Sequence, residues 1–575
     1  MRFLKLFSVA VFVPLALCLS YELDNEQVTL DYHQPFEQEH EHANSGIKDP
    51  LDECFDEKVN WALEHYRVPG LAISLVQNGS TFAKGYGYAN LSSHSPTPAT
   101  NKTLFYAGST TKAHIAAALS LLITDNEKYP TIQWETTLQS ILPEFQLSDP
   151  LVAAQITISD ILSHRTGLPR HDMILLQNLS RKKVVQRLKY LPLTKGIRAE
   201  FQYCNLMYIV AAYLIETVTG VDIEVFMTEN LWNVLGMKNT FFTPDSAKEH
   251  GLEADIAEGY WLNPASNRTI PTGNIYNPSL TGAGNILTSV TDYALWISAL
   301  LNHVPPISET GYNMLFSAQS IILRHSYDPF SSPLFYGLGW MIQSYKGETI
   351  IFHDGAQDGF GAFVLLVPRR GLGVSILGNQ ASGTNSAAQV LAFELVDRLL
   401  GVEKSERFNW VAVIDAGLQL SKLTNTTLDA LYPNLPDKSS LLPHPLSLAS
   451  YEGVYTHPAY PAISISSTCR PFNPTTPTPS KWTGSHLCGS FQDIIDMATS
   501  NLTFDFLHIT GQYWTLVMEA EGMQDGTRVE FDIAPEGLVS KVGIEFEVTM
   551  REKKGKIWFE RESHVVNGFE KRWEA

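Results

Sequence analysis

The pattern of hydrophobic positions predicts a helix and then a β-hairpin near the start of the chain. The run from Asp52 to His65 is typical of a helix. Residues 70–77 are then almost continuously apolar, Asn78-Gly79 supplies a tight turn, and residues 81–88 follow as a second strand-like run. An Asn-Gly pair between two such runs indicates two antiparallel strands.

The pattern then becomes helical before strands return. From about 115 to 335 it is mainly helical, with apolar stretches at 207–218 and 291–301. Four strand patterns follow at 336–342, 349–353, 361–367 and 373–377. A closing helix is then predicted over 386–400. Strands at both ends of a mainly helical insertion predict an α/β (α+β) fold, an antiparallel sheet flanked by helices.

The chain changes character after residue 405, which ends the main domain expected over 51–405. Prolines cluster between 418 and 447, so a linker is expected over 406–447. Alternating runs then predict a small all-β domain over 448–575, either a sandwich or a barrel. These runs are 451–455, 502–509, 513–518, 528–533, 542–550 and 556–562.

The first 50 residues have the features of an exported protein. Met1 to Lys5 is basic, residues 6–19 are apolar, and small residues follow, which predicts a signal peptide over 1–20. The apolar run is short for a bilayer and no later segment qualifies, so no membrane contact is expected after cleavage. Residues 21–50 are acidic and lack apolar periodicity, as in an N-terminal extension. A secreted protein is therefore expected.

Glycosylation motifs and cysteines agree with a secretory route. Asn-x-Ser/Thr occurs at seven positions, which are Asn78, Asn90, Asn101, Asn178, Asn267, Asn425 and Asn501. Cys469 and Cys488 flank a Pro/Thr-rich loop and are candidates for a disulfide. Cys54 and Cys204 are either a second pair or two buried thiols.

Composition narrows the class of protein. Hydrophobic residues make up 44% of the 575 residues and charged residues 18%, as in ordinary globular proteins. The formal net charge of -19 argues against nucleic acid as a partner. No Cys-x-x-Cys pattern occurs, so no metal site is expected, and no cofactor is predicted. The expected partner is a small-molecule or peptide substrate, and the oligomeric state stays open.

Ser109-Thr110-Thr111-Lys112 is the strongest chemical signal in the chain. Residues i and i+3 share a helix face, so the lysine ammonium can reach the serine hydroxyl. The N-terminus of a helix also favours developing negative charge. About two such Ser-x-x-Lys matches are expected by chance in a chain of this length. Ser180-Arg181-Lys182-Lys183 is one such match, in a basic stretch, so partners elsewhere must distinguish the two.

Tyr203-Cys204-Asn205 supplies two such partners. Tyr203 and Asn205 lie two residues apart and point the same way in an extended loop. A lysine ammonium beside Tyr203 favours its phenolate, which would accept the serine proton. Asn205 can hydrogen-bond Lys112 and a substrate carbonyl, whereas Cys204 is interpreted as a small packing residue.

His353-Asp354-Gly355 ends another strand-like run. Gly355 lets a substrate backbone approach closely, and the N–H groups of Ser109 and Ala356 are the candidate oxyanion hole. Other polar residues near the motifs are assigned structural roles because the lysine–tyrosine pair already supplies a base. They are His164, His171, Asp172 and Asp354.

In this order, Ser-x-x-Lys, Tyr-x-Asn and His-x-Gly resemble the motifs of the serine β-lactamase and penicillin-binding-protein superfamily. The resemblance is greatest to class C β-lactamases and related DD-peptidases, and it covers roughly residues 55–400. Three further stretches carry it, which are Leu162–Pro169, Leu235–Thr240 and Tyr336–Trp340. It implies that Ser109 is the nucleophile and that Lys112 and Tyr203 move its proton. Asn205 would then position Lys112 and the substrate.

His353 departs from that family pattern, because β-lactamases usually carry lysine at this position. A lysine would be a fixed cation for a substrate carboxylate, whereas histidine is charged only in part near neutral pH. We therefore expect a serine hydrolase that acts on an ester, amide or lactone through acyl-Ser109, rather than an antibiotic-hydrolysing β-lactamase. An acyltransferase and a non-catalytic binding protein of this fold are the alternative hypotheses.

Overall fold

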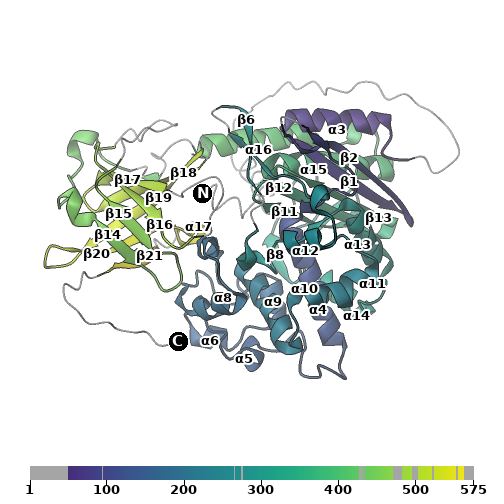
Figure 1. Cartoon of the computed structure of the whole chain (residues 1–575), viewed down its shortest axis with the longest axis horizontal. Coiled ribbons are helices and arrows are strands. Elements are labelled where there is room, and N and C mark those ends of the chain that lie inside the picture. The colour runs from purple at the N-terminus through teal and green to yellow at the C-terminus, as the bar shows by residue number, and fades with distance from the viewer. Residues whose placement is uncertain are drawn as a thin grey trace. The chain divides into compact units, whose positions relative to one another are not determined.

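Two compact units make up the chain, one ending at Leu423 and the other beginning at Thr424 (Figure 1). The computed structural model describes residues 49–92, 95–263, 266–273, 276–425, 431–432, 434–469, 482–494, 503–520, 523–551 and 555–562. The predicted signal peptide over 1–20, almost all of the extension over 21–50, and Asn501 lie outside the described residues.

A nine-stranded antiparallel sheet forms the centre of the larger unit, within its described residues. The strand order is β3-β2-β1-β13-β12-β11-β10-β9-β8. The strands are β1 (Gly70–Gln77), β2 (Ser80–Asn90), β3 (Thr97–Pro98), β8 (Ser320–Leu323), β9 (Leu334–Tyr336), β10 (Met341–Tyr345), β11 (Glu348–Gln357), β12 (Phe360–Val367) and β13 (Leu372–Gly378). The early hairpin pairs with the late strands, so that Ile73 lies opposite Ile376. The sheet confirms the predicted fold class.

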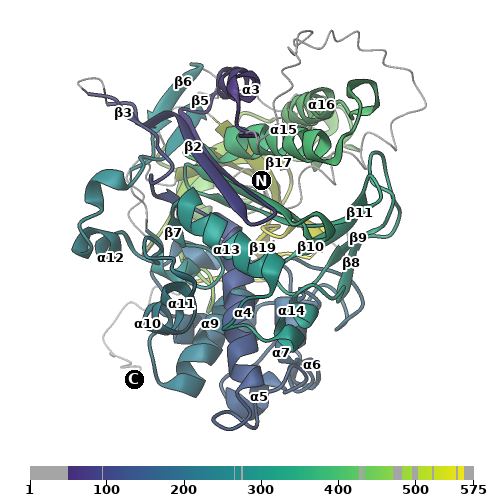
Figure 2. The same cartoon turned by 90° about the vertical axis from the view of Figure 1, so that its right-hand side faces the viewer.

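Helices cover both faces of this sheet (Figure 2). α3 (Glu53–His65), α15 (Ala381–Leu400) and α16 (Trp410–Asn425) share one hydrophobic core with the sheet, and α13 (Val290–Asn302) packs on the opposite face. The insertion contributes α4 (Thr111–Thr124), α5 (Leu138–Ile141), α6 (Pro150–Ala153), α7 (Ile158–Leu162), α8 (Arg181–Arg187), α9 (Asn205–Thr219), α10 (Ile223–Met227), α11 (Asn233–Leu235), α12 (Pro244–Glu249) and α14 (Glu309–Leu315). Two separate two-stranded sheets are formed by β4 (Phe105–Tyr106) with β7 (Leu287–Thr288) and by β5 (Tyr260–Asn263) with β6 (Arg268–Pro271).

The expected linker over 406–447 contains the helix α16, which the sequence interpretation missed. Trp410 is 4% exposed and its ring stacks on Phe393 of α15, with ring centroids 4.1 Å apart. Apolar burial of this kind stabilises a helix more than local propensity does. The linker was predicted from the cluster of prolines, and all of these prolines come after the end of the helix.

The predicted strand over 336–342 is also wrong, because a turn divides it into β9 and β10. The Gly337 N–H donates to the Trp340 carbonyl, and Gly339 has a φ of +81°. A Cβ on Gly339 would lie 2.9 Å from the backbone of Ala113 in α4. Only glycine allows this approach, so the turn lies against the helix that carries Lys112.

The smaller unit is a closed barrel. Its strands, in barrel order, are β14 (Gly453–Thr456), β15 (Ile463–Ser466), β16 (His486–Phe491), β17 (Thr503–Thr510), β18 (Tyr513–Ala520), β19 (Met523–Ile533), β20 (Val539–Ile544) and β21 (Ile557–Arg561). β14 pairs with β21, Tyr455 opposite Arg561, which closes the barrel. β15 and β16 were not predicted, and the end of the run at 542–550 forms the short helix α17 (Val548–Arg551).

Cys469 and Cys488 form the predicted disulfide in this barrel. Cys54 and Cys204 are free thiols, so they are not a second pair. Cys204 is buried, as a packing residue would be, whereas Cys54 is partly exposed.

Three glycosylation candidates are exposed, namely Asn78, Asn178 and Asn267, and Asn90 and Asn101 are partly buried. Among the described helices, none alone has the length and apolar composition to cross a bilayer. α9 and the segment Ile223–Leu235 meet that criterion only together, with a bend of 83° between them.

Replacing Cys488 by alanine is expected to destabilise the barrel by about 3 kcal/mol, because the bond closes a loop with a sequence separation of 19 residues. Calorimetric unfolding under non-reducing conditions measures this change. Cys54→Ala is the matched control and is expected to leave the barrel transition in place. Equal transitions in the wild-type protein and Cys488→Ala would contradict the prediction.

Candidate active site

Ser109 lies in a 3-10 turn, Gly108–Thr110, that leads directly into α4. α4 is apolar and almost entirely buried, which is typical of a helix at the centre of a fold. Ser109 is 9% exposed, and no side-chain capping hydrogen bond is found at the start of this helix. Ser180, in the second Ser-x-x-Lys match, does cap its helix by accepting from the Lys183 N–H. The two matches are therefore structurally different.

Lys112 Nζ is surrounded by three oxygens. It lies 3.1 Å from Ser109 Oγ, 2.8 Å from Asn205 Oδ1 and 2.8 Å from the Ala283 carbonyl oxygen. Lys112 is fully buried, and this burial, together with the charge of Arg170, holds its pKa well below the ordinary value. A neutral amine donates two N–H groups, and the two carbonyl-type oxygens accept both. In that neutral form the lone pair would be left to accept a hydrogen bond from the Ser109 hydroxyl, whose oxygen lies 3.1 Å away.

The Lys112 amine and the Arg170 guanidinium both lie close to the Tyr203 ring. Lys112 Nζ is 4.8 Å and Arg170 Cζ 4.9 Å from the ring centroid. Burial raises the pKa of the Tyr203 hydroxyl, and Arg170 and the neighbouring Ser109 offset this only in part. The sequence argument for a phenolate therefore does not hold, because desolvation outweighs the nearby positive charge. Within the described residues, the buried hydroxyl makes no hydrogen bond of ordinary geometry.

Asn205 is oriented by Asp172. Asn205 Nδ2 donates to Asp172 Oδ1 at 3.0 Å, which leaves Asn205 Oδ1 facing Lys112. Arg170 Nε donates to the other carboxylate oxygen at 2.6 Å. Asp172, which the sequence interpretation treated as structural, therefore positions a residue of the site. Arg170 and the Ala283 carbonyl were missed, and no local sequence pattern marks them.

The end of β11 lies against the Ser109 turn. Strand β10 pairs with β11 only as far as Phe352. On that side, residues 353–357 of β11 are therefore not paired with β10, and β11 contacts the turn Gly108–Thr110. A Cβ on Gly355 would overlap the Ala107 carbonyl, and one on Gly108 would lie 2.5 Å from Ala356 N. The two glycines allow this approach, which brings the backbone N–H groups of Ser109 and Ala356 to one region.

His353 is fully buried and neutral. Nδ1 donates to the Asp354 carbonyl oxygen at 2.5 Å, and Nε2 accepts from the Tyr336 hydroxyl at 3.0 Å. Burial and the charge of Lys112 lower the pKa of His353 to about 3. Both ring nitrogens are thus engaged within the protein, and His353 supplies no fixed cation at the position where the resemblance expects one.

The other two histidines near the motifs make structural contacts. His164 Nδ1 accepts from the Cys204 N–H at 3.1 Å, and its ring centroid is 4.3 Å from that of Tyr203. His171 Nε2 donates to the Pro192 carbonyl oxygen at 3.0 Å. These contacts agree with the structural roles predicted for both residues.

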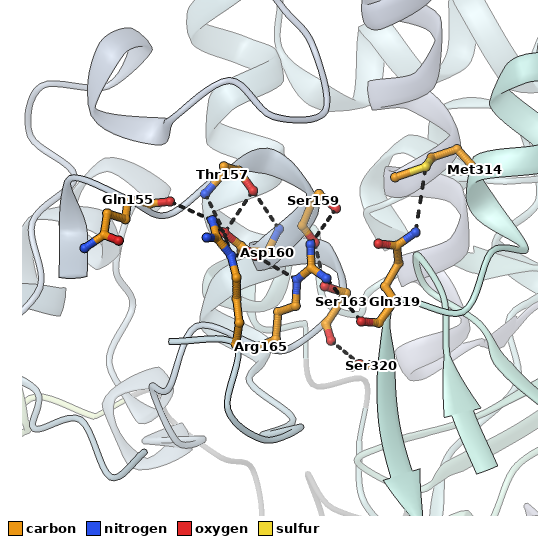
Figure 3. Close-up of polar contacts among 10 residues, drawn as sticks. Gln155, Thr157, Ser159, Asp160, Ser163, Arg165, Met314, Gln319 and Ser320 are labelled. Carbon is orange, nitrogen blue, oxygen red and sulfur yellow. Dashed lines mark hydrogen bonds and ion pairs between the residues drawn. The ribbon is translucent and has the colours of Figure 1, made fainter. Parts of the chain in front are cut away.

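Asp160 is a buried carboxylate within a network of polar contacts (Figure 3). Asp160 is fully buried and accepts from Thr157 Oγ1 at 2.9 Å, Arg165 Nε at 2.7 Å and Arg198 Nη2 at 2.7 Å. The Arg198 backbone N–H also donates to the Arg165 carbonyl oxygen, which joins the segment before Arg170 to the segment before Tyr203. Burial alone would raise the pKa of Asp160, but the arginines and Thr157 more than offset this and lower it.

Asp160→Asn is expected to destabilise the larger unit by about 3 kcal/mol, because two arginines lose a buried counter-ion. Urea unfolding measures the loss. Asp245→Asn removes a carboxylate that is 87% exposed and is expected to change stability by less than about 0.5 kcal/mol. A loss as small as that control would contradict a stabilising role for Asp160.

Comparisons with known proteins agree with this fold and these motifs. The Beta-lactamase family matches residues 51–396. Over 522 residues the chain is 34% identical to unguisins hydrolase ungD' of Aspergillus campestris (strain IBT 28561), covering 89% of this chain and 92% of that protein. Over 539 residues it is 33% identical to unguisins hydrolase ungD of Aspergillus violaceofuscus (strain CBS 115571), with 89% and 91% covered.

A solved structure shows the same fold at low sequence identity. The octameric penicillin-binding protein homologue from Pyrococcus abyssi aligns with a TM-score of 0.54 and 17% identity, over 88% of this chain and 99% of that one. The chain belongs to the β-lactamase family, as the ordered motifs predicted. The family and the two hydrolase relatives support a serine hydrolase of this superfamily.

Proposed function

We propose that this chain is a secreted serine hydrolase that cleaves an amide, ester or lactone through an acyl-Ser109 intermediate. The observation that carries the proposal is the position of Lys112 Nζ, which lies 3.1 Å from Ser109 Oγ and 2.8 Å from both Asn205 Oδ1 and the Ala283 carbonyl oxygen. A buried neutral amine beside a serine is suited to act as a general base.

Acylation begins when the Ser109 proton passes to Lys112 Nζ. Oγ then forms a bond to the substrate carbonyl carbon, and the carbonyl oxygen becomes an oxyanion. The N–H groups of Ser109 and Ala356 donate to that oxyanion in our proposal. The oxyanion collapses, the bond to the leaving group breaks, and the leaving group needs one proton.

Tyr203 is our candidate for the donor of that proton. The raised pKa of Tyr203 keeps its hydroxyl protonated until it gives its proton to the leaving group. Lys112, which lies close to the Tyr203 ring, then passes the proton it took from Ser109 to the Tyr203 oxygen. Water then attacks the acyl-enzyme, with the neutral Lys112 as base, and the acid product and the Ser109 hydroxyl are released. An acyltransferase would use an alcohol or amine in place of this water.

The relatives and the neutral site support a direction for substrate testing. Both long relatives are named as hydrolases of unguisins, so unguisins are the first compounds to test here. The neutral His353 supports a substrate that does not need a lysine-bound carboxylate, as in esterase- or peptidase-like members rather than antibiotic β-lactamases. The basic and apolar N-terminal pattern and the Cys469–Cys488 disulfide support the secretory part of the proposal.

Ser109→Ala is expected to abolish covalent labelling by a small alkyl fluorophosphonate, because the probe bonds to the nucleophilic oxygen. Intact-protein mass spectrometry and peptide mapping measure the adduct. Ser180→Ala removes the hydroxyl of the second Ser-x-x-Lys match and is the control, with labelling retained. Undiminished labelling of Ser109→Ala would exclude Ser109 as the nucleophile.

The rate of labelling is expected to rise with pH and to level off well below pH 10. Only the neutral form of Lys112 accepts a proton, so the rate is low below the pKa of Lys112 and constant above it. Burial places that pKa well below the ordinary 10.5, which fixes the direction of the shift. Second-order labelling rates measured across pH test this. A rate that still rises about tenfold per pH unit near pH 10 would show an ordinary lysine pKa.

A further inference from the structure

Asp354 is a buried acid that the proposed acylation steps do not use. It follows His353 in β11, is 5% exposed, and its Oδ1 atom is buried without a hydrogen-bond partner in the described structure. His353 Nδ1 lies 3.9 Å from this oxygen, which is too far for a hydrogen bond. A buried acceptor without a donor is unfavourable, so such a group in a native site calls for an explanation.

Asp354 lies in the segment 353–357 of β11, and β11 contacts the turn that carries Ser109. The charge of the Asp354 carboxylate acts on Lys112, on the Tyr203 hydroxyl and on the Tyr336 hydroxyl, which lie on three different elements around Ser109. Lys112 and Arg170 act on Asp354 in return. Burial is the largest effect and raises the pKa of Asp354 to about 7, so a substantial fraction is ionised at neutral pH.

The position along β11 defines where a ligand group would lie. Asp354 is two residues before Ala356, the proposed oxyanion donor, which corresponds to about 6–7 Å along a strand. A substrate group that meets Asp354 is therefore a few bonds away from the scissile carbonyl carbon. The neutral His353 adds no positive charge there.

We propose that Asp354 Oδ1 accepts a hydrogen bond from an N–H group of the substrate, a few bonds from the scissile carbonyl. The site would then select amide-bearing substrates, such as internal bonds of peptides, over substrates with a free carboxylate at that place. This inference rests on the proposed acyl-Ser109 function and adds the class of substrate. Asp354 is a specificity residue in this view.

Arg170 offers the opposing hypothesis. Its Nη2 atom is also buried without a partner, so it is a candidate for binding a substrate carboxylate. Its Nε, however, is already paired with Asp172, and the neighbouring Asp354 carboxylate would repel a second anion. Preference for a carboxylate substrate would favour Arg170 and overturn the role of Asp354.

Three acetylglycyl thioesters test the proposal directly. Their leaving groups are mercaptoacetamide, N,N-dimethylmercaptoacetamide and mercaptoacetate, which differ in N–H groups, in charge and, for the dimethyl compound, in two methyl groups. For the full chain, kcat/KM for the carboxamide is expected to exceed that of the other two by about tenfold or more, as for a hydrogen bond to a charged acceptor. Released thiol measures the rates. Equal rates, or the highest rate with mercaptoacetate, would overturn the inference.

Asp354→Asn is the matching variant. It is expected to reduce the carboxamide-to-carboxylate ratio by about tenfold, because the charge that repels the carboxylate is gone. Asp358→Asn removes the next acid of the same hairpin, whose pKa is raised by burial, and is expected to leave the ratio unchanged. A ratio that stays the same in Asp354→Asn, or falls equally in both variants, would overturn the inference.

Fluorophosphonate labelling separates this inference from the proposed function. If wild-type Ser109 is labelled and the thioesters are not discriminated, only the role of Asp354 is wrong. If wild-type Ser109 is not labelled, both the proposed acyl-enzyme function and the role of Asp354 that rests on it are wrong. The wild-type comparison of the three thioesters does not depend on the folding of any variant.

Discussion

The burial of the Lys112 amine is the constraint on which the site depends. In water this amine would be an ammonium and could not accept the Ser109 proton. Helix α4 removes it from solvent, and the oxygens of Asn205 and Ala283 take its N–H groups. Asp172 then orients Asn205, so a carboxylate outside the reacting pair determines which atom faces the lysine.

Burial favours the neutral form of several groups of the site. Lys112 and His353 are shifted toward their neutral amine and imidazole, and Tyr203 toward its neutral phenol. The charges that persist belong to the Arg170–Asp172 pair and, in part, to Asp354. In the proposed reaction, proton transfer would take place among neutral hydrogen-bonding groups, and the remaining charges would orient Asn205 and act on the substrate.

The sequence predicted those parts of the arrangement that depend on residues close together in the chain. The helical spacing placed Lys112 near Ser109, and the Asn78-Gly79 turn placed the first hairpin. The helix α16 was missed because its anchoring contact, Trp410 on Phe393, is not local. For the same reason the choice between a sandwich and a barrel stayed open and the contribution of Arg170 was missed, since each depends on residues far apart in the sequence.

The sequence by itself determined the order of the motifs, the i to i+3 spacing of the serine and lysine, and the short apolar runs that form the central strands of the sheet. These features depend on backbone geometry within a few residues. Only the tertiary structure decided which of these groups are charged and which way they point. Protonation states follow from desolvation and from neighbours brought together by folding, as His353 shows by being a neutral, fully engaged imidazole.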